Sequence, residues 1–71
     1  MFEMKVEKQL NIADRSLILG IPSYDSIPKV VSAANEKINV IGVSLGAKPP
    51  FMSLEIEKIS FDLVGKTVKA I

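Results

Sequence analysis

Apolar and polar residues alternate along the first stretch of the chain, from residue 2 to residue 12. The apolar residues stand at even positions, and Lys8 is the one interruption of the series. They are Phe2, Met4, Val6, Leu10 and Ile12. A period of two residues is typical of a β-strand that has one face on a core and the other in water. The pattern therefore predicts an amphipathic strand here and a sheet around it.

The next two strands are predicted from apolar runs bounded by turn residues. Residues 17–19 form a short apolar run that ends at Gly20, and the polar segment before it favours a turn, which predicts a hairpin with the first strand. Residues 38–45 are mostly apolar and β-branched, as in strands. Their alternation slips close to Gly42, so we expect a bulge or a sharp bend there.

The last third of the chain predicts two more strands. Residues 46–50 must form a loop, because consecutive prolines continue neither a helix nor a central strand. Residues 52–56 alternate, and the apolar phase then moves, which predicts a second bulge near 57–58. A turn through Gly65 leads to a short final strand over 67–71.

One segment between the strands has helical spacing. Four apolar residues follow the positions i, i+3, i+4 and i+7: Ile27, Val30, Val31 and Ala34. Pro28 stands where the first turn of a helix tolerates a proline. The spacing predicts a short helix over 27–36. An irregular turn is the alternative, because Val30 and Val31 are β-branched and ten residues make a marginal helix.

The length of the chain limits how these elements can be arranged. A domain of 71 residues buries only roughly 60% of the surface that its unfolded chain exposes, and 48% of the residues are hydrophobic. A flat sheet of five short strands would leave an apolar face in water. We therefore expect a single domain, 1–71, of mainly β class: a small five-to-six-stranded antiparallel barrel or half-barrel with one short helix near 27–36. An α+β open sheet covered by that helix is the alternative.

The composition excludes several classes of function. The chain has no histidine, cysteine or tryptophan, so it lacks the usual general base, the thiolate nucleophile and the common zinc ligands. We expect no enzyme activity, no catalytic residues, no cofactor and no metal. Nine basic and eight acidic residues leave a net charge of +1, far from the excess that general DNA binding needs.

Targeting signals are also missing from the sequence. The N-terminal residues lack the basic-then-apolar pattern of a signal peptide, and no apolar run approaches the roughly 20 residues of a membrane span. We expect a cytoplasmic protein without membrane association, and we expect residues 1–71 to be a complete small protein.

Short matches to catalytic motifs lack the context that their chemistry needs. Residues 42–46 match G-x-S-x-G, but prolines follow where a helix is required. Residues 65–67 match the end of a P-loop without its earlier glycine, and residues 26–29 match S-x-x-K without further support. Glu55 and Glu57 share one strand face as a candidate carboxylate pair. We interpret the motifs as structural and this pair as part of a solvated face.

Two loops carry the side chains that we predict to contact a partner. They are the loops 13–16 and 46–51, with a third position in the proline-containing loop 21–28. The candidate residues are Asp14, Arg15, Tyr24, Lys48 and Phe51. Arg15, Tyr24 and Phe51 have the chemistry to stack on a single-stranded base, although packing in the core or the loops is the interpretation that we favour for them.

Two stretches of the chain together resemble a known protein family. The first runs from Val6-Glu7-Lys8 through Ile12-Ala13-Asp14-Arg15 to Leu17-Ile18-Leu19-Gly20. The second runs from Met52-Ser53-Leu54-Glu55-Ile56-Glu57 to Leu63-Val64-Gly65-Lys66-Thr67-Val68. Both resemble the second domain of translation GTPases, the β-barrel that follows the nucleotide-binding domain in elongation factor Tu and its relatives. The chain departs from that family at 29–32, where the mid-domain Gly-Asp turn is missing.

The resemblance implies a function in binding. It implies a small docking barrel without a GTPase site, which contacts RNA or a partner protein through its loops. A structural or oligomerisation module is the alternative, because the chain is very apolar and has little interior; a homo-oligomer would form through a strand edge or the 27–36 segment. With a net charge of +1, any RNA binding should be weak and should be lost at moderate salt.

Overall fold

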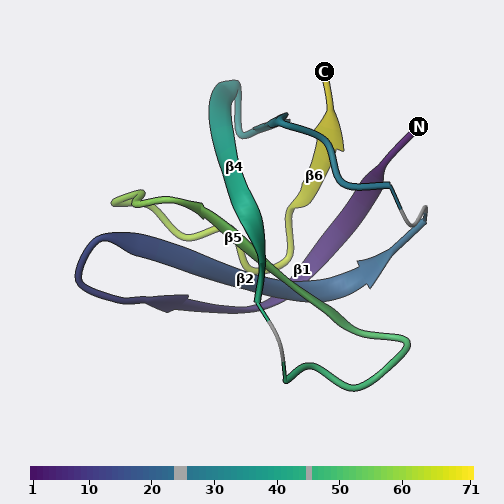
Figure 1. The fold of residues 1–71 in the computed structure, drawn as a ribbon. Coiled ribbons are helices and arrows are strands. Elements are labelled where there is room, and N and C mark those ends of the chain that lie inside the picture. Colours follow the sequence, from purple (N-terminus) through teal and green to yellow (C-terminus); the bar gives the residue numbers. More distant parts are fainter. Residues whose placement is uncertain (24–25, 45) are drawn as a thin grey trace.

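The chain folds into a closed antiparallel β-barrel. The computed structural model describes residues 1–23, 26–44 and 46–71, and this part of the chain contains six strands and no helix. The strands are β1 (Glu3–Asn11), β2 (Arg15–Pro22), β3 (Val30–Ala33), β4 (Glu36–Ser44), β5 (Met52–Glu57) and β6 (Thr67–Ala70). They pair in the order β1-β2-β5-β4-β3-β6, and β6 pairs back onto β1 (Figure 1). The prediction of a small antiparallel barrel is confirmed.

The predicted helix over 27–36 is wrong. β3 lies in this range, with Val31 fully buried and paired to both β4 and β6. Ala34 and Asn35 then form a tight turn with φ of 52° and 65°, a conformation that suits a two-residue hairpin and that a right-handed helix does not contain. The β-branched residues therefore follow their strand preference, which two neighbouring strands reinforce. Within the described residues, no helix is long and apolar enough to cross a membrane.

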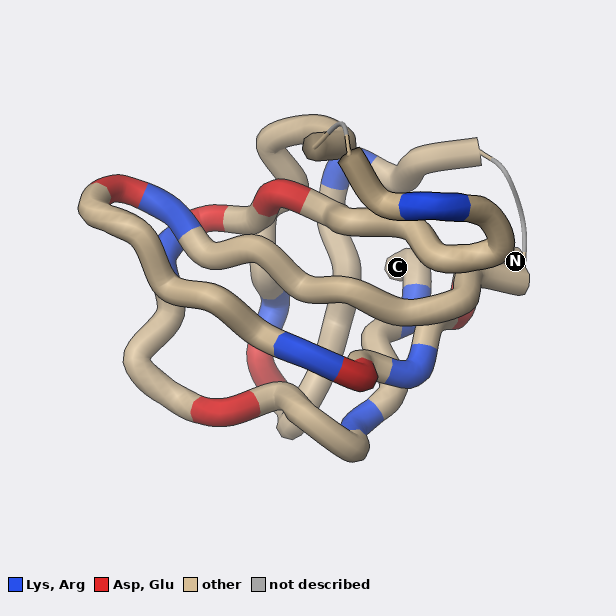
Figure 2. Tube along the Cα trace, turned by 90° about the horizontal axis from the view of Figure 1, so that it is seen from below, with Lys and Arg blue, Asp and Glu red and all other residues tan. Residues whose placement is uncertain are grey.

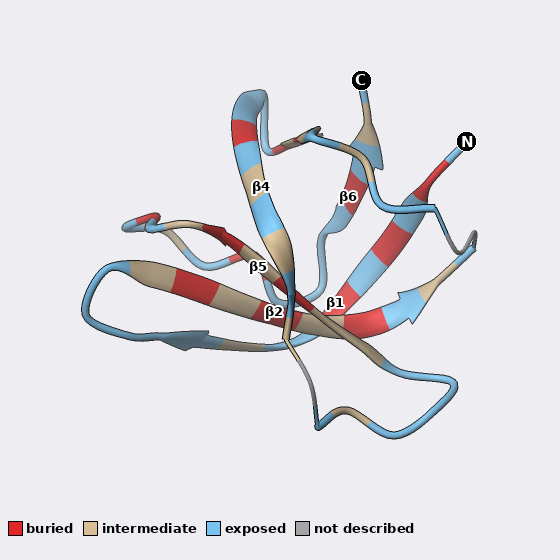
Figure 3. Cartoon of the chain, viewed as in Figure 1, coloured by how far each residue is buried: buried red, intermediate tan, exposed pale blue. Residues whose placement is uncertain are grey.

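The core fills the inside of the barrel with side chains from all six strands, from the residue before β1 and from the segment after β5. Its members are Phe2, Met4, Val6, Ile18, Val31, Ala33, Ile38, Leu54, Ile56, Ile59, Leu63 and Val68. Buried residues alternate with accessible ones along β2 and along β1 as far as Val6, as Figure 3 shows. Because a six-stranded barrel is narrow, one inward side chain from every second position is enough to fill it.

A bulge in β1 changes the face to which its last residues belong. The register of β1 against β2 shifts between Val6 and Lys8, so Glu7 is the extra residue. Beyond the bulge Leu10 is 59% exposed and Ile12 is 39% exposed. The alternation in the sequence predicts both on the core side, and this is wrong because one inserted residue moves the following side chains to the other face.

The other two predicted bulges have different outcomes. The register of β4 against β5 shifts between Val40 and Gly42, which confirms the predicted irregularity there. No bulge lies near 57–58, because β5 ends at Glu57 and the chain leaves the sheet. The segment that follows closes one end of the barrel, where the Gln9 side chain accepts a hydrogen bond from Leu63 N (2.7 Å) and donates one to the Phe61 carbonyl (3.0 Å).

Candidate docking surface

An apolar stripe runs along the outside of the β1–β2 hairpin. On β2 the inward residues are buried, and the outward residues between them are aliphatic. On β1 the bulge turns Leu10 outward, directly opposite Leu17. We call this set the aliphatic stripe: Leu10, Ile12, Leu17, Leu19 and Ile21. Leu17 and Leu19 are half-buried, and the other three are exposed.

β2 is therefore apolar on both of its faces. It carries no charged residue after Arg15. Figure 2 shows where the basic and acidic residues lie along the chain. Strands that read as continuous apolar runs are typically covered on both faces, whereas a strand with one solvated face alternates with polar residues. The core covers the inner face of β2. Its outer face is aliphatic and remains partly exposed.

A groove lies over this face. It has a volume of about 590 Å³, and its lining includes Leu10, Leu17 and Leu19 together with Gly46 and Ala47 from the loop after β4. The 46–51 loop thus supplies one wall of the groove, and the hairpin supplies its apolar floor. A concave apolar floor with a few polar neighbours is the usual character of a binding surface on a protein.

Charged residues flank the stripe on its two sides. Lys5 lies opposite Ile21 and Lys8 lies opposite Leu19, both on β1. On the other side, β5 places Glu55 opposite Leu17 and Glu57 opposite Arg15. Because residues directly opposite each other in an antiparallel pair share a face, these lysines and glutamates border the stripe on the outer surface. Glu3 and Glu7 are also exposed on β1, so this side of the stripe carries charges of both signs.

The hairpin end of this face is held by Arg15. Its guanidinium lies 2.5 Å from Oε1 of Glu55 and donates 3.2 Å hydrogen bonds to both carboxylate oxygens of Asp14. The hydrogen bonds from Arg15 lower the pKa of Asp14, and the same contacts raise the pKa of Arg15. Glu57 accepts a 2.8 Å hydrogen bond from the backbone N–H of Asn39. The candidate carboxylate pair is thus bound to two separate structural partners.

The structure places the predicted partner-binding residues in two groups. Asp14 and Arg15 lie at the turn of the β1–β2 hairpin, where their side chains form an ion pair. Lys48 and Phe51 lie together in the 46–51 loop, where Phe51 N donates to the Lys48 carbonyl (2.9 Å) and both side chains are exposed. Tyr24 lies outside the described residues.

These two groups stand at opposite ends of one strand pair. β2 and β5 pair so that Arg15 faces Glu57 at one end and Gly20 faces Met52 at the other. The strand between them carries the aliphatic stripe, which sequence reasoning missed as a surface. The run Leu17-Ile18-Leu19 was the available signal, since an amphipathic strand needs only one of its faces to be apolar.

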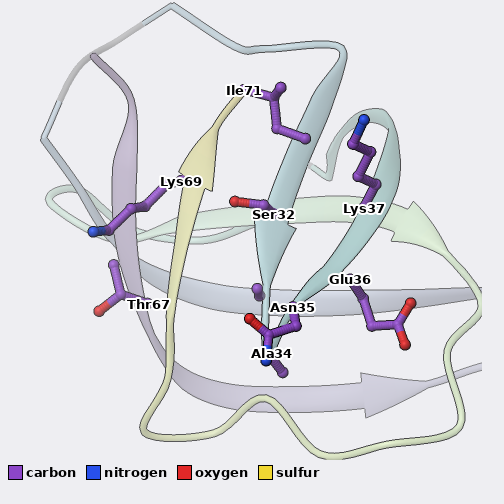
Figure 4. A pocket seen from close by; sticks show the side chains of 9 residues that line it. Ser32, Ala34, Asn35, Glu36, Lys37, Thr67, Lys69 and Ile71 are labelled. Carbon is purple, nitrogen blue, oxygen red and sulfur yellow. The ribbon is translucent and has the colours of Figure 1, made fainter.

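A second depression lies on the opposite side of the barrel. It has a volume of about 530 Å³ over β3, β4 and β6. Ser32 pairs with Lys37 on one side and with Lys69 on the other, and Figure 4 shows the two lysines on either side of it. Neither β3 nor β6 contains an acidic residue, although Lys69 lies 4.0 Å from Glu3 of β1. We call Lys37, Ser32 and Lys69 the lysine row.

Neither face carries a recognisable metal centre. Among the residues that the structure describes, no group of three or more acidic, histidine or cysteine side chains is arranged to hold a metal ion. No protein-family model, curated protein or solved structure matches the chain.

Proposed function

We propose that the chain is a non-enzymatic docking module that binds a protein partner on the outer face of β1, β2 and β5. The observation that carries the proposal is the apolar character of β2 on both faces, of which the barrel core covers one. Exposed apolar residues that are gathered on one face of a small domain indicate an interaction site, whereas scattered ones do not.

The flanks of the stripe define the chemistry of the partner. The partner presents aliphatic side chains to the stripe and acidic groups to Lys5 and Lys8. Glu57 favours a basic group on the β5 side, although its hydrogen bond to Asn39 already occupies one oxygen. In such an interface the apolar centre supplies most of the affinity, and the charged rim selects the orientation.

The resemblance to translation-factor barrels supports a docking function in the same way. It rests on residues 6–20 and 52–68, which lie in the β1–β2 hairpin and in the region from β5 to β6. We propose this relationship from those residues alone. A solved structure of a translation-factor barrel with the same strand order and the same β1 bulge would strengthen it, and a different strand order would contradict it.

A peptide selection tests the docking function directly. A library of random peptides is selected on the immobilised protein, and the binding of the selected peptides is then compared between wild type and two variants. Leu10→Asp places a charge in the stripe, and the control Ile71→Asp makes the same change at an exposed residue beside the lysine row. We expect aliphatic peptides with acidic residues whose binding is lost in Leu10→Asp and kept in Ile71→Asp. Peptides that bind both variants equally would contradict the proposal.

RNA binding on the lysine row is a second candidate function. The specific observation is that β4 and β6 place Lys37 and Lys69 on either side of Ser32 of β3, although Glu36 also lines this depression. Lysine and hydroxyl groups bind phosphate oxygens without reading sequence. The face is small and the net charge is +1, so this binding would be weak.

A further inference from the structure

The segment between β5 and β6 closes one end of the barrel without forming a strand. It covers residues 58–66, and we call it the strap. Ile59 and Leu63 of the strap belong to the buried core, at 8% and 0% exposure, and Phe61 packs against that core. The other residues of the strap are exposed. Two fully inserted side chains in nine residues therefore anchor the strap to the barrel.

Two side chains of the β1–β2 hairpin hold the middle of the strap. The side-chain amide of Gln9 donates a hydrogen bond to the Phe61 carbonyl (3.0 Å) and accepts one from the Leu63 N–H (2.7 Å). The Ser16 hydroxyl oxygen accepts a hydrogen bond from the Ile59 N–H (3.2 Å). The middle of the strap thus depends on side-chain hydrogen bonds, whereas a strand is held by a ladder of backbone hydrogen bonds.

Asn11 connects these two attachment points. Its Oδ1 accepts hydrogen bonds from Nε2 of Gln9 (3.2 Å) and from the Ser16 hydroxyl (2.8 Å). The side chains that hold the two halves of the strap therefore belong to one hydrogen-bond network. Because the members of such a network support one another, the loss of one attachment weakens the other.

The strap also lies along the part of β1 that extends past β6. β6 pairs with residues 3–5, whereas β1 continues to Asn11. Beyond the pairing with β6, the backbone of Val6 bonds to the end of the strap and the side chain of Gln9 bonds to its middle. Exposed strand edges pair readily with other chains. The closed strap covers this edge of β1, and an open strap would uncover it.

We infer that the strap opens as a unit while the six strands stay paired, and that Gln9 is the side chain that holds it closed. Local opening takes place where few apolar side chains are buried and few backbone hydrogen bonds must break. The strap meets both conditions, whereas each strand of the closed barrel pairs with two neighbours. The inference concerns the end of the barrel and does not rest on the docking function.

Native-state hydrogen exchange, measured by NMR on the whole chain at low urea concentrations, tests the inference. The amides of Ile59 and Leu63 should exchange through one opening that hardly depends on urea, because the strap exposes little surface when it opens. The amides of Val31 and Leu54, which lie in paired strands, should exchange more slowly and with a steep dependence on urea. Strap amides that exchange as slowly as these, with the same urea dependence, would overturn the inference.

Two variants test the role of Gln9. Gln9→Met removes both hydrogen bonds to the strap and keeps a side chain of similar length. It should speed the exchange of Leu63 and of Ile59 about tenfold or more, although the hydrogen bond of the latter is not to Gln9. Val31→Ala is the matched control, because it weakens the core under the paired strands. It should speed the exchange of Leu54 and leave both strap amides unchanged.

The variants also define the results that would contradict a strap that opens as a unit. Faster exchange in Gln9→Met at Leu63 alone would overturn the inference, because it would show the fraying of a single hydrogen bond. Strap amides that accelerate in Val31→Ala as much as Leu54 does would overturn it too, because the strap would then open only with the barrel. If Val31→Ala does not fold, the urea dependence of the wild type decides between the two mechanisms.

Discussion

At the scale of single residues, Gly20 shows how closely two strands approach at the point where the barrel turns. A Cβ atom built on Gly20 would lie 2.1 Å from the carbonyl oxygen of Lys5 and 2.8 Å from Cγ of Met4. Gly20 also lies opposite Val6, immediately before the bulge of β1. The missing side chain lets β1 pass across β2, so this position needs glycine because of packing.

Replacing Gly20 with alanine should therefore destabilise the fold. We expect Gly20→Ala to lower the free energy of unfolding by about 2–3 kcal/mol, because the backbone of β1 must move to admit the methyl group. Gly42→Ala is the matched control, since a Cβ there meets nothing within 4 Å, and we expect a change within about 0.5 kcal/mol. Urea unfolding of both variants measures the difference. Equal effects at the two glycines would contradict this account of the closure.

Asp14 should make the stability of the hairpin depend on pH. Its pKa is lowered, mainly by the hydrogen bonds from Arg15, so the unfolded chain takes up the proton at a higher pH than the folded chain does. The stabilisation is therefore present above about pH 4 and is lost as the pH falls through the lowered pKa. We expect the difference in free energy of unfolding between wild type and Asp14→Asn to shrink between about pH 5 and pH 2. Urea unfolding across this range measures it, and a constant difference would show that Asp14 contributes no ionic stabilisation.

At the scale of the elements, the β3–β4 hairpin shows how pairing overrides local spacing. The apolar spacing of 27–34 fits a helix, and Val31 and Ala33 also fit a strand, since both are buried at a period of two. Two strands pair with this segment: β4, which follows the turn, and β6, which lies at the end of the chain. A helix of ten residues is marginally stable, and pairing with two neighbouring strands stabilises the segment more. The segment therefore forms a strand.

The turn of this hairpin contains a residue whose replacement should stabilise the protein. Ala34 has φ of 52°, a left-handed conformation that costs a residue with a Cβ about 1–2 kcal/mol. We expect Ala34→Gly to stabilise the protein by about 0.5–1 kcal/mol, after the entropy that glycine loses on folding is subtracted. Ala34→Val should instead destabilise it, because β-branched residues tolerate this conformation least. Thermal unfolding of the two variants should therefore move the melting temperature in opposite directions.

The elements differ in how far the sequence predicts them. The strands at 2–12, 38–45 and 52–56 are predicted because each has a recognisable apolar pattern over several residues. The last strand, β6, is predicted from the turn at Gly65 that precedes it. The bulge at Glu7 could not be located, since Lys8 breaks the alternation without showing whether the strand ends, slips or continues. The exposure of Leu10 depends on that bulge, and so the stripe could not be predicted either.

At the scale of the whole molecule, the charges are divided between two faces of a barrel that is nearly neutral. The lysine row lies over β3, β4 and β6, and the aliphatic stripe with its mixed flanks lies over β1, β2 and β5. A net charge of +1 conceals this division, because it averages the two faces. Local potential, more than net charge, decides which ligand approaches which side.

RNA binding on the lysine row should be weak and sensitive to salt. With about two lysine contacts, the logarithm of the affinity for a labelled oligouridine should fall with the logarithm of the salt concentration with a slope of about −1.4. Lys37→Gln combined with Lys69→Gln should remove most of this slope, whereas Lys48→Gln, in the loop beside the other groove, should leave it unchanged. Fluorescence anisotropy measures all three proteins. Tight binding that resists salt would contradict an electrostatic site.

The sequence by itself determined that this protein is a single small β domain. Period-two patterns and turn residues are local properties of the sequence. The absence of histidine and cysteine is a property of the composition. None of these depends on which strand lies beside which. Tertiary structure decided the closure of the barrel, the register of its strands and which side chains face the core or the solvent. Each depends on partners far apart in the chain, such as β6 between β1 and β3, or the one-residue shift at Glu7. The candidate surface belongs to this second group, because a side chain of a strand faces solvent or core only after its register is set.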